Sequence, residues 1–293
     1  MTNSKTTGTL MIIGGGEDRT DNKTVLEKFI SLAGGPQKPL VVITAASTVP
    51  DDVWKMYEEA FDALGVSEVR HLLLPDRASA EDAEAARAVA GAAGVFMTGG
   101  DQKRLLAVIG GTKVEQAMRE AYKGGACIAG TSAGASAMCA HMIAAGKAEL
   151  APEKDAARLT AGLGFVTRVV IDQHFSQRHR INRLLSVIAQ SPFLLGAGID
   201  EDTALIVHGQ SGMEVVGEGT VTVTDCRHAT TNIADVKSGE VPEMIGVQLH
   251  LLPSGSAFVA DGAERTGNLP DTAKPANQAM NDFIRYLTDR TND

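Results

Sequence analysis

The strongest constraint on the fold of this chain is the alternation of short apolar runs with amphipathic segments over its first two thirds. The runs lie at 10–13, 40–44, 69–74, 94–98 and 126–129. Between them, apolar residues recur at helical spacing near 25–30, 51–64, 79–89 and 114–121, with Asp51 placed to cap the second helix. Apolar strands separated by helices are typical of a parallel sheet covered on both faces. The pattern predicts an α/β fold with a mostly parallel central sheet and helices on both faces.

After about residue 195 this alternation gives way to short strands joined by turns. Strands are predicted at 203–207, 213–216, 221–224, 245–252 and 257–259, and a last helix carries Met280, Phe283, Ile284 and Leu287. We interpret these strands as antiparallel additions at the edge of the sheet. Because no repeat, low-complexity segment or linker interrupts the chain, we expect residues 1–293 to form one domain, in which the part from about 205 onward is mainly strands plus a helix.

Charge and cysteine content exclude several kinds of partner. The 27 Lys and Arg residues against 36 Asp and Glu residues give a formal net charge of −9, without a basic block. This balance argues against nucleic acid and against anionic membranes as partners. No apolar stretch approaches the roughly 18 residues that suggest a membrane-spanning helix. Three cysteines without a CxxC pair indicate a reducing compartment, so we expect a cytoplasmic protein.

The first candidate for chemistry is the sequence Gly-Thr-Ser-Ala-Gly at 130–134, which directly follows a predicted strand. Glycines on both sides of Ser132 are typical of the sharp strand–turn–helix motif that exposes a nucleophile. The alternative is a buried serine in an ordinary tight turn. A second glycine motif, Thr-Gly-Gly-Asp-Gln at 98–102, ends the fourth strand, where open α/β sheets bind ligands. The backbone N–H groups of Gly100 and Ala133 are candidates for an oxyanion hole, and an ordinary turn is the alternative.

His174 closes the apolar run at 169–171 and is therefore placed at a strand end, where it could act as a base on Ser132. A lone histidine is more often structural, but the polar residues around this one favour a functional role. The carboxylate that orients it could come from Asp200, Glu201 or Asp202 in a later acidic turn. The sequence does not choose among these three, and a hydrated acidic turn is the alternative.

A basic cluster precedes and enters the helix whose core stripe is Ile181, Leu184, Leu185 and Ile188. Its members are Arg178, His179, Arg180 and Arg183. Cations at the start of a helix oppose the helix dipole, so the cluster is interpreted as a site for anionic groups; the alternative is a solvated basic face. The glycines at 14–16 are interpreted as a tight loop beside the cleft, with Glu17 and Asp18 available for a cationic group. The seven histidines show no metal-binding spacing, so no metal site is expected.

Together these motifs resemble those of cyanophycinases, which belong to a serine peptidase group that also contains aspartyl dipeptidases. The resemblance covers about residues 10–210 and is carried by the segments 12–18, 98–102, 130–135, 172–183 and 198–204. The sequence Asp-Gln-His-Phe at 172–175, with the arginines that follow it, is the most specific of these. Gly16 departs from the Gly-Gly-Ala that many relatives are expected to have at 14–16. The resemblance implies a fold like that of class I glutamine amidotransferases.

The resemblance also implies roles for individual residues. Ser132 would be the nucleophile, His174 the base and Glu201 the acid that orients it. The residues implied to contact substrate are Gln102, Asp172, Gln173, Arg178, Arg180 and Arg183. The resemblance implies no cofactor and suggests a homodimer.

The implied substrate is cyanophycin, a poly-aspartate backbone that bears arginine through β-amide links and so carries both carboxylates and guanidiniums. The three arginines of the cluster would bind carboxylates, and a guanidinium would bind Glu17, Asp18, Asp101 or Asp172. The implied reaction releases β-Asp-Arg dipeptides through an acyl-enzyme at Ser132. The alternatives are an aspartyl or isoaspartyl dipeptidase of the same family and, in a different class, a non-catalytic binding protein on the same scaffold.

Overall fold

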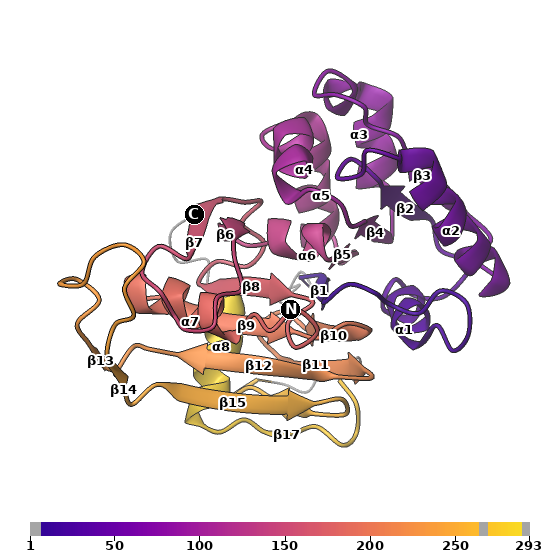
Figure 1. Cartoon of the computed structure of the whole chain (residues 1–293). Helices are drawn as coiled ribbons and strands as arrows, with labels where there is room; N and C mark the ends of the chain where they lie inside the picture. Colours follow the sequence, from indigo (N-terminus) through magenta and orange to yellow (C-terminus); the bar gives the residue numbers. More distant parts are fainter. Residues whose placement is uncertain (1–6, 264–268, 289–293) are drawn as a thin grey trace.

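The computed structural model describes residues 7–263 and 269–288 (Figure 1). The first half of the chain, drawn in indigo to magenta, forms the part at the upper right of the view. The second half, drawn in orange to yellow, forms the part at the lower left. Among the described residues, no helix is long and apolar enough to cross a membrane.

A nine-stranded sheet lies at the centre of the molecule. In sheet order its strands are β17 (Lys274–Pro275), β16 (Ala257–Val259), β11 (Gly212–Gly217), β10 (Thr203–Val207), β1 (Thr9–Ile13), β5 (Cys127–Thr131), β4 (Gly94–Met97), β2 (Leu40–Ile43) and β3 (Val69–Leu72). The last five run parallel to one another, and they correspond to the five apolar runs of the sequence. The prediction of a mostly parallel central sheet is therefore confirmed.

Helices cover both faces of the parallel strands, as the sequence predicts. One face is covered by α1 (Thr24–Leu32) and α2 (Pro50–Ala63). The opposite face is covered by α3 (Ala83–Ala90), α4 (Gln102–Ile109) and α5 (Lys113–Lys123). Successive strand residues point to opposite faces, so Met11 packs with α1 and α2 while Ile12 belongs to the core on the other side.

The helix boundaries differ from the sequence prediction in three places. Asp51 does not cap α2, because Val49 is the cap residue and Pro50 occupies the first position, where a missing N–H and a fixed φ suit a helix start. The helix predicted at 79–89 is a 3₁₀ turn, Ser79–Glu81, followed by α3, whose cap is Asp82. Helix α4, which Asp101 caps, was not predicted.

The C-terminal strands extend the central sheet and also build a second one. Strands β10, β11 and β16 continue the central sheet beyond β1 by antiparallel pairing, as expected. The second sheet, which was not predicted, has the order β15 (Gln248–Pro253), β12 (Thr220–Asp225), β9 (Leu195–Ile199) and β8 (Val169–Gln173). The strand predicted at 221–224 therefore does not lie at the edge of the central sheet. A short apolar run predicts a strand but carries no information about its pairing partner.

The remaining elements of the described chain are helices and two hairpins. They are α6 (Ala133–Ala137), α7 (Ile181–Gln190), α8 (Gln278–Thr288), the hairpin of β6 (His141–Gly146) with β7 (Ala157–Ala161), and the hairpin of β13 (Thr230–Thr231) with β14 (Met244–Ile245). The single strand predicted at 245–252 is thus divided between β14 and β15. One apolar core cluster contains Val207 of the central sheet, Ile171 of the second sheet and Phe283 of α8.

Candidate active site

Ser132 lies in a tight turn between a central strand and a helix. Strand β5 ends at Thr131 and α6 begins at Ala133, so the predicted strand–turn–helix arrangement is present. The φ angle of Ser132 is 52°, which is uncommon for a residue with a Cβ atom. Such strained backbone conformations cluster at functional sites. The turn presents Ser132 at the carboxyl end of β5, where α/β sheets bind ligands.

Three side chains from distant parts of the chain form a hydrogen-bonded series. The Oγ of Ser132 lies 2.8 Å from Nε2 of His174, and Nδ1 of His174 lies 2.6 Å from Oε1 of Glu201. His174 is 8% exposed, whereas the side chain of Glu201 is 39% exposed. A carboxylate beside Nδ1 favours the tautomer that carries its proton there. Nε2 is then free to accept the proton of the serine hydroxyl.

The structure distinguishes the three acidic residues that the sequence leaves open. The buried carboxylate of Asp200 accepts three hydrogen bonds, at 2.7 to 3.1 Å, from groups of Ser176 and Thr220. The carboxylate of Asp202 accepts a backbone N–H of the loop after β1 at 2.9 Å. Within the described parts of the chain, Glu201 is the acid that contacts the imidazole.

Three consecutive carbonyl groups hold the three turns that carry this series. The carbonyl oxygens of Ile13, Gly14 and Gly15 accept the backbone N–H groups of Ser132, His174 and Asp202, at 3.0, 2.7 and 2.9 Å respectively. Each of the three donor residues has a positive φ, of 52°, 50° and 46°. We call the segment 13–15 the carbonyl row. Because L residues avoid this backbone region, the surrounding hydrogen bonds help to hold the turns in it.

The carbonyl row also lies in contact with the imidazole. A Cβ atom on Gly15 would lie 2.3 Å from Cε1 of His174, and the φ of Gly15 is 95°. Both the space and the backbone conformation therefore require glycine at this position. The glycine loop at 14–16, which the sequence places beside the cleft, therefore packs directly against the His174 ring.

The loop after β4 lies beside Ser132. A Cβ atom on Gly99 would lie 3.4 Å from the Cβ of Ser132, and a Cβ atom on Gly100 would lie only 2.2 Å from the carbonyl oxygen of Ala46. Within the described residues, the N–H groups of Gly100 and Ala133 donate to no backbone carbonyl. Two open donors near a nucleophile are what an oxyanion hole requires.

Asp172 binds two of the three arginines in the predicted cluster. Arg183 donates from Nε to Oδ2 at 2.7 Å and from Nη2 to Oδ1, and Arg180 donates from Nη1 to Oδ1 at 3.2 Å. A further nitrogen of Arg183, Nη1, donates to the carbonyl oxygen of Gly146 at 3.0 Å. All three charged side chains are at least nine-tenths buried. Burial lowers the pKa of Arg180 to about 10, so its guanidinium is still a cation at neutral pH.

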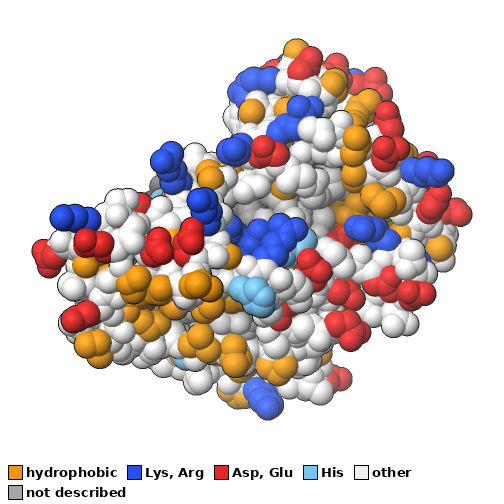
Figure 2. All heavy atoms as spheres, viewed as in Figure 1, with side chains coloured by type: hydrophobic (Ala, Val, Ile, Leu, Met, Phe, Trp, Pro, Cys, Tyr) orange, Lys and Arg blue, Asp and Glu red, His pale blue; other side chains and the backbone are white. Residues whose placement is uncertain are grey.

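Two of the three arginines of the cluster thus have an acidic partner within the chain. Arg180 and Arg183 neutralise an acid of their own chain, because a buried guanidinium without a counter-charge is costly. Arg178 is exposed and forms no ion pair with the described residues. Figure 2 shows Lys or Arg side chains and His side chains gathered where the surface is hollowed between the two parts of the molecule.

The two glutamines in the predicted set lie in the same region. Gln173 accepts hydrogen bonds from Arg180 through both its side-chain and its backbone oxygen. The Nε2 of Gln102 donates to the carbonyl oxygen of Ile143 in β6 at 3.0 Å. Both side chains therefore connect the site to neighbouring elements.

The sequence matches the profile of peptidase family S51 over residues 10–215. The chain belongs to peptidase family S51. It is similar to the cyanophycinases of Synechococcus elongatus, Trichormus variabilis and Geminocystis herdmanii, with 38%, 36% and 35% identity. These alignments cover 86%, 85% and 85% of this chain and 79%, 84% and 92% of the respective relatives. The resemblance to cyanophycinases that the motifs indicate is thereby confirmed.

A solved structure shares the fold of this S51 peptidase. It is a peptidase from an acI-B1 actinobacterium, with a TM-score of 0.65 and 24% identity, covering 87% of this chain and 98% of that one. The α/β fold class is therefore confirmed. As a member of family S51, the protein is a hydrolase of the serine peptidase type.

The pKa of His174 in this S51 peptidase is lowered from its ordinary value of 6.5. Burial of the imidazole is the largest cause, since it disfavours the charged form. The hydrogen bond to Glu201 acts in the opposite direction, and the charges of Arg178 and Arg180 lower the pKa further. His174 is consequently neutral at neutral pH, which is the form that accepts a proton.

Glu17, which the sequence offers for a substrate cation, lies in a buried network beside Ser132 that the sequence does not predict. The carboxylate of Glu17, which is 2% exposed, accepts hydrogen bonds from the hydroxyl of Thr131 at 2.5 Å, from Tyr57, and from Arg19 at 3.2 Å. Periodicity assigned Tyr57 to the apolar face of a helix, and nothing in the pattern indicates where its hydroxyl points. Burial, with the negative charge of Glu17 as a further cause, raises the pKa of Tyr57 well above its ordinary value, so its hydroxyl remains a donor.

All four acids that were expected to bind a substrate guanidinium have partners within the chain. Glu17 and Asp172 bind arginines, as described above. Asp18 accepts the backbone N–H groups of Thr20, Asp21 and Lys23, and Asp101 caps α4. Across the residues that the structure describes, no three His, Cys, Asp or Glu side chains are grouped for a metal ion.

Proposed function

We propose that this S51 peptidase is a serine exopeptidase that hydrolyses cyanophycin to β-Asp-Arg dipeptides. The observation that carries the proposal is the unbroken series from Ser132 through His174 to Glu201, with contacts of 2.8 and 2.6 Å. It occurs in a chain that is 35–38% identical to cyanophycinases over most of its length. The same series argues against the alternative of a non-catalytic binding protein.

In the proposed mechanism the Oγ of Ser132 attacks the carbonyl carbon of the scissile amide. As the Oγ–carbon bond forms, Nε2 of His174 takes the hydroxyl proton, and Glu201 stabilises the resulting imidazolium through Nδ1. The N–H groups of Gly100 and Ala133 receive the developing oxyanion. His174 then returns the proton to the leaving amine as the carbon–nitrogen bond breaks. A water molecule, activated by the same imidazole, hydrolyses the acyl-enzyme and regenerates Ser132.

Substrate recognition in this proposal depends on the polar groups near Ser132 that have no hydrogen-bond or ion-pair partner among the described residues. Arg178 is the exposed cation beside His174, so we assign it to a substrate carboxylate. The buried pair of Arg180 and Arg183 with Asp172 shapes the floor of the site and holds Gln173 in place. Gln102, whose Nε2 is engaged by β6, keeps its carbonyl oxygen for substrate.

Incubation with purified cyanophycin, followed by mass analysis of the products, tests the proposal. The expected result is release of β-Asp-Arg dipeptides, with no free arginine and no longer fragments at early times. Cleavage of free aspartyl or isoaspartyl dipeptides without release from the polymer would instead support the dipeptidase. Absence of hydrolysis of both substrates would contradict the proposed function.

The pH profile supplies a further test of His174 as the base. Because its pKa is lowered from 6.5, mainly by burial, the acid limb of kcat/KM is expected below pH 6.5. Arg178→Gln removes a positive charge that disfavours the imidazolium, so this variant should move the acid limb to higher pH. Lys123→Gln, an exposed change at the end of α5, should leave it unmoved. An acid limb at or above pH 6.5 in the wild type would contradict the assignment.

We also propose that the protein forms one domain and acts as a cytoplasmic homodimer. The single domain is supported by the apolar core cluster that both sheets share. The three cysteines are buried and unpaired, which suits a reducing compartment. The edge strand β15 exposes Leu249 and Leu251, which gives an apolar surface for self-association. Sedimentation of the purified protein measures its oligomeric state.

A further inference from the structure

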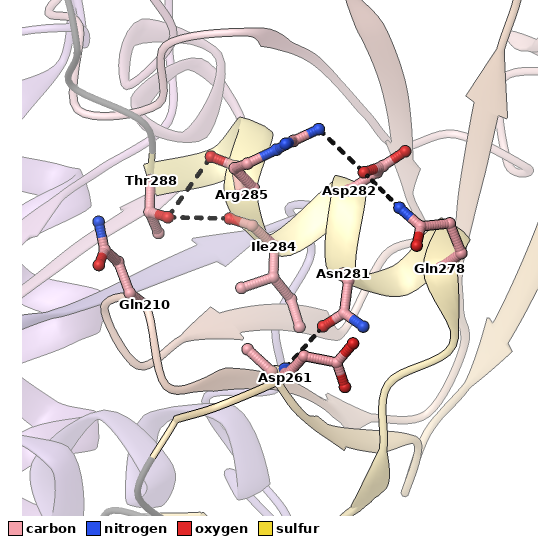
Figure 3. A pocket seen from close by; sticks show the side chains of 9 residues that line it. Gln210, Asp261, Gln278, Asn281, Asp282, Ile284, Arg285 and Thr288 are labelled. Carbon is pink, nitrogen blue, oxygen red and sulfur yellow. Dashed lines mark hydrogen bonds and ion pairs between the residues drawn. The ribbon is translucent and has the colours of Figure 1, made fainter.

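A cavity of about 380 Å³ lies against the hairpin of β6 and β7, away from Ser132. Its walls are the hairpin residues 145–147, 149 and 153–158, together with Ser238 and Gly239. A cavity of about 470 Å³ beside α8 offers a comparison (Figure 3). There Arg285 and Gln278 both donate to the carboxylate of Asp282, at 2.9 and 3.1 Å.

The hairpin cavity is lined instead by unpaired charges of both signs. One cation of its walls, Lys154, donates through Nζ to backbone carbonyl groups. Five further charged side chains line the cavity, namely the cations Lys147 and Arg158 and the acids Glu149, Glu153 and Asp155. In the part of the chain that the structure describes, none of these five side chains forms an ion pair or a side-chain hydrogen bond. A ligand that carries both a carboxylate and a guanidinium would supply partners for both groups.

The backbone around this cavity is held in place on two sides. On the α7 side, the carbonyl oxygens of Glu149 and Glu153 accept hydrogen bonds from Asn182 and Ser186. On the other side, Lys154 donates through Nζ to the carbonyl oxygens of Ala234 and Val236, and its backbone pairs with residues 239 and 240. The cavity is thus formed before any ligand binds, which reduces the ordering cost of binding.

The cavity adjoins the buried ion pair of the active site. Gly146 lines it, and the carbonyl oxygen of Gly146 accepts a hydrogen bond from Arg183, which in turn binds Asp172. Asp172 lies two residues before His174 on the same segment. A polymer whose end lies at Ser132 could therefore pass over α7 toward the hairpin.

We propose that the hairpin cavity is an accessory subsite that binds a further β-Asp-Arg unit of cyanophycin while Ser132 acts on the chain end. The proposal rests on the proposed function, because it assigns the subsite to the same polymer. Lys147 and Arg158 receive the carboxylate of the unit, and the three acids receive its guanidinium. Binding at a second point on one polymer raises the effective concentration of its end at the active site.

The experiment compares polymer and short substrate in the double variant Lys147→Glu/Arg158→Glu. For purified cyanophycin, KM is expected to rise about tenfold or more at unchanged kcat, because the tethered contact is lost. For a two-unit β-Asp-Arg oligomer, whose two units flank the scissile bond and leave no further unit for the subsite, kcat and KM are expected to stay unchanged. Lys123→Glu makes half of that charge change, at the carboxyl end of α5, and it should leave kcat and KM unchanged for both substrates.

The outcomes separate this proposal from the proposed function. If the wild type releases dipeptides from cyanophycin and the double variant has an unchanged polymer KM, the subsite is overturned while the function stands. If both substrates lose activity equally in the double variant, the hairpin serves the active site itself and the subsite is again overturned. If the wild type hydrolyses neither substrate, the proposed function and the proposed subsite are both contradicted. Thermal unfolding of each variant confirms that the exposed changes leave the fold intact.

Discussion

Replacing Ser132 by alanine is expected to lower the rate of cyanophycin hydrolysis by a factor of about 10⁵ or more. The variant loses the atom that forms the acyl-enzyme, and His174 then has no hydroxyl to deprotonate. Alanine keeps a Cβ atom, so the backbone turn at a φ of 52° is not made easier or harder by the change. Binding should persist, because the proposed substrate contacts come from other residues.

The measurement combines dipeptide release with co-sedimentation of enzyme and insoluble polymer. Ser136→Ala is the matched control, since Ser136 lies in the next turn of α6 and makes no contact with His174 that the structure records. It should retain near-wild-type rates. Hydrolysis by Ser132→Ala within tenfold of the wild type would show that another group is the nucleophile. Loss of polymer binding along with activity would show instead that the variant disrupts the site.

The second large effect is expected on stability and concerns Asp172. Asp172→Ala should lower the free energy of unfolding by about 3–5 kcal/mol, because it leaves two buried guanidiniums without a counter-charge. The side chain of Asp172 is fully buried, and those of Arg180 and Arg183 are about nine-tenths buried. Urea unfolding measures the change. Asp62→Ala, on the exposed face of α2, should change stability by no more than about 0.5 kcal/mol.

A triple variant distinguishes an ion pair from a substrate contact. Replacing the whole set, as Asp172→Leu/Arg180→Met/Arg183→Met, should recover most of the lost stability, because apolar groups of similar size need no counter-charge. The triple variant should not recover activity if Asp172, Arg180 and Arg183 also hold the substrate-binding residues in position. A stable Asp172→Ala variant with a raised KM would contradict this view and would show that the arginines face the substrate, as the sequence first suggested.

The sequence was most informative where local pattern and position determine the outcome. Four of the predicted strands became the parallel strands β1, β2, β4 and β5, because apolar runs suit strands covered on both faces. The fifth, β3, contains Arg70 and His71 and lies at the edge of the sheet. The sequence places Ser132 and His174 at the ends of predicted strands, and in the structure they do follow strands β5 and β8. Because β5 lies in the central sheet and β8 in the second sheet, their contact at 2.8 Å depends on how the two sheets pack, which the sequence pattern does not show.

The sequence was least informative where the contacts of a residue depend on the direction in which its side chain points. Asp200, Glu201 and Asp202 are equivalent in charge, and only the fold turns Asp200 toward Ser176 and Glu201 toward the imidazole. Asp172 and Arg183 are eleven residues apart, and their pairing depends on how α7 packs beside β8. The second sheet was missed for a related reason, since strand pairing is a long-range property that periodicity does not encode.

The carbonyl row also determines when the site can assemble as the chain is synthesised. Its acceptors at 13–15 precede their donors at 132, 174 and 202 by more than a hundred residues. Strand β1 also lies between β5 and β10, so it gains its second neighbour only when 203–207 have been made. Contacts so distant in sequence form late in folding. A growing chain therefore cannot hold Ser132, His174 and Glu201 together until the segment that carries residue 202 has left the ribosome.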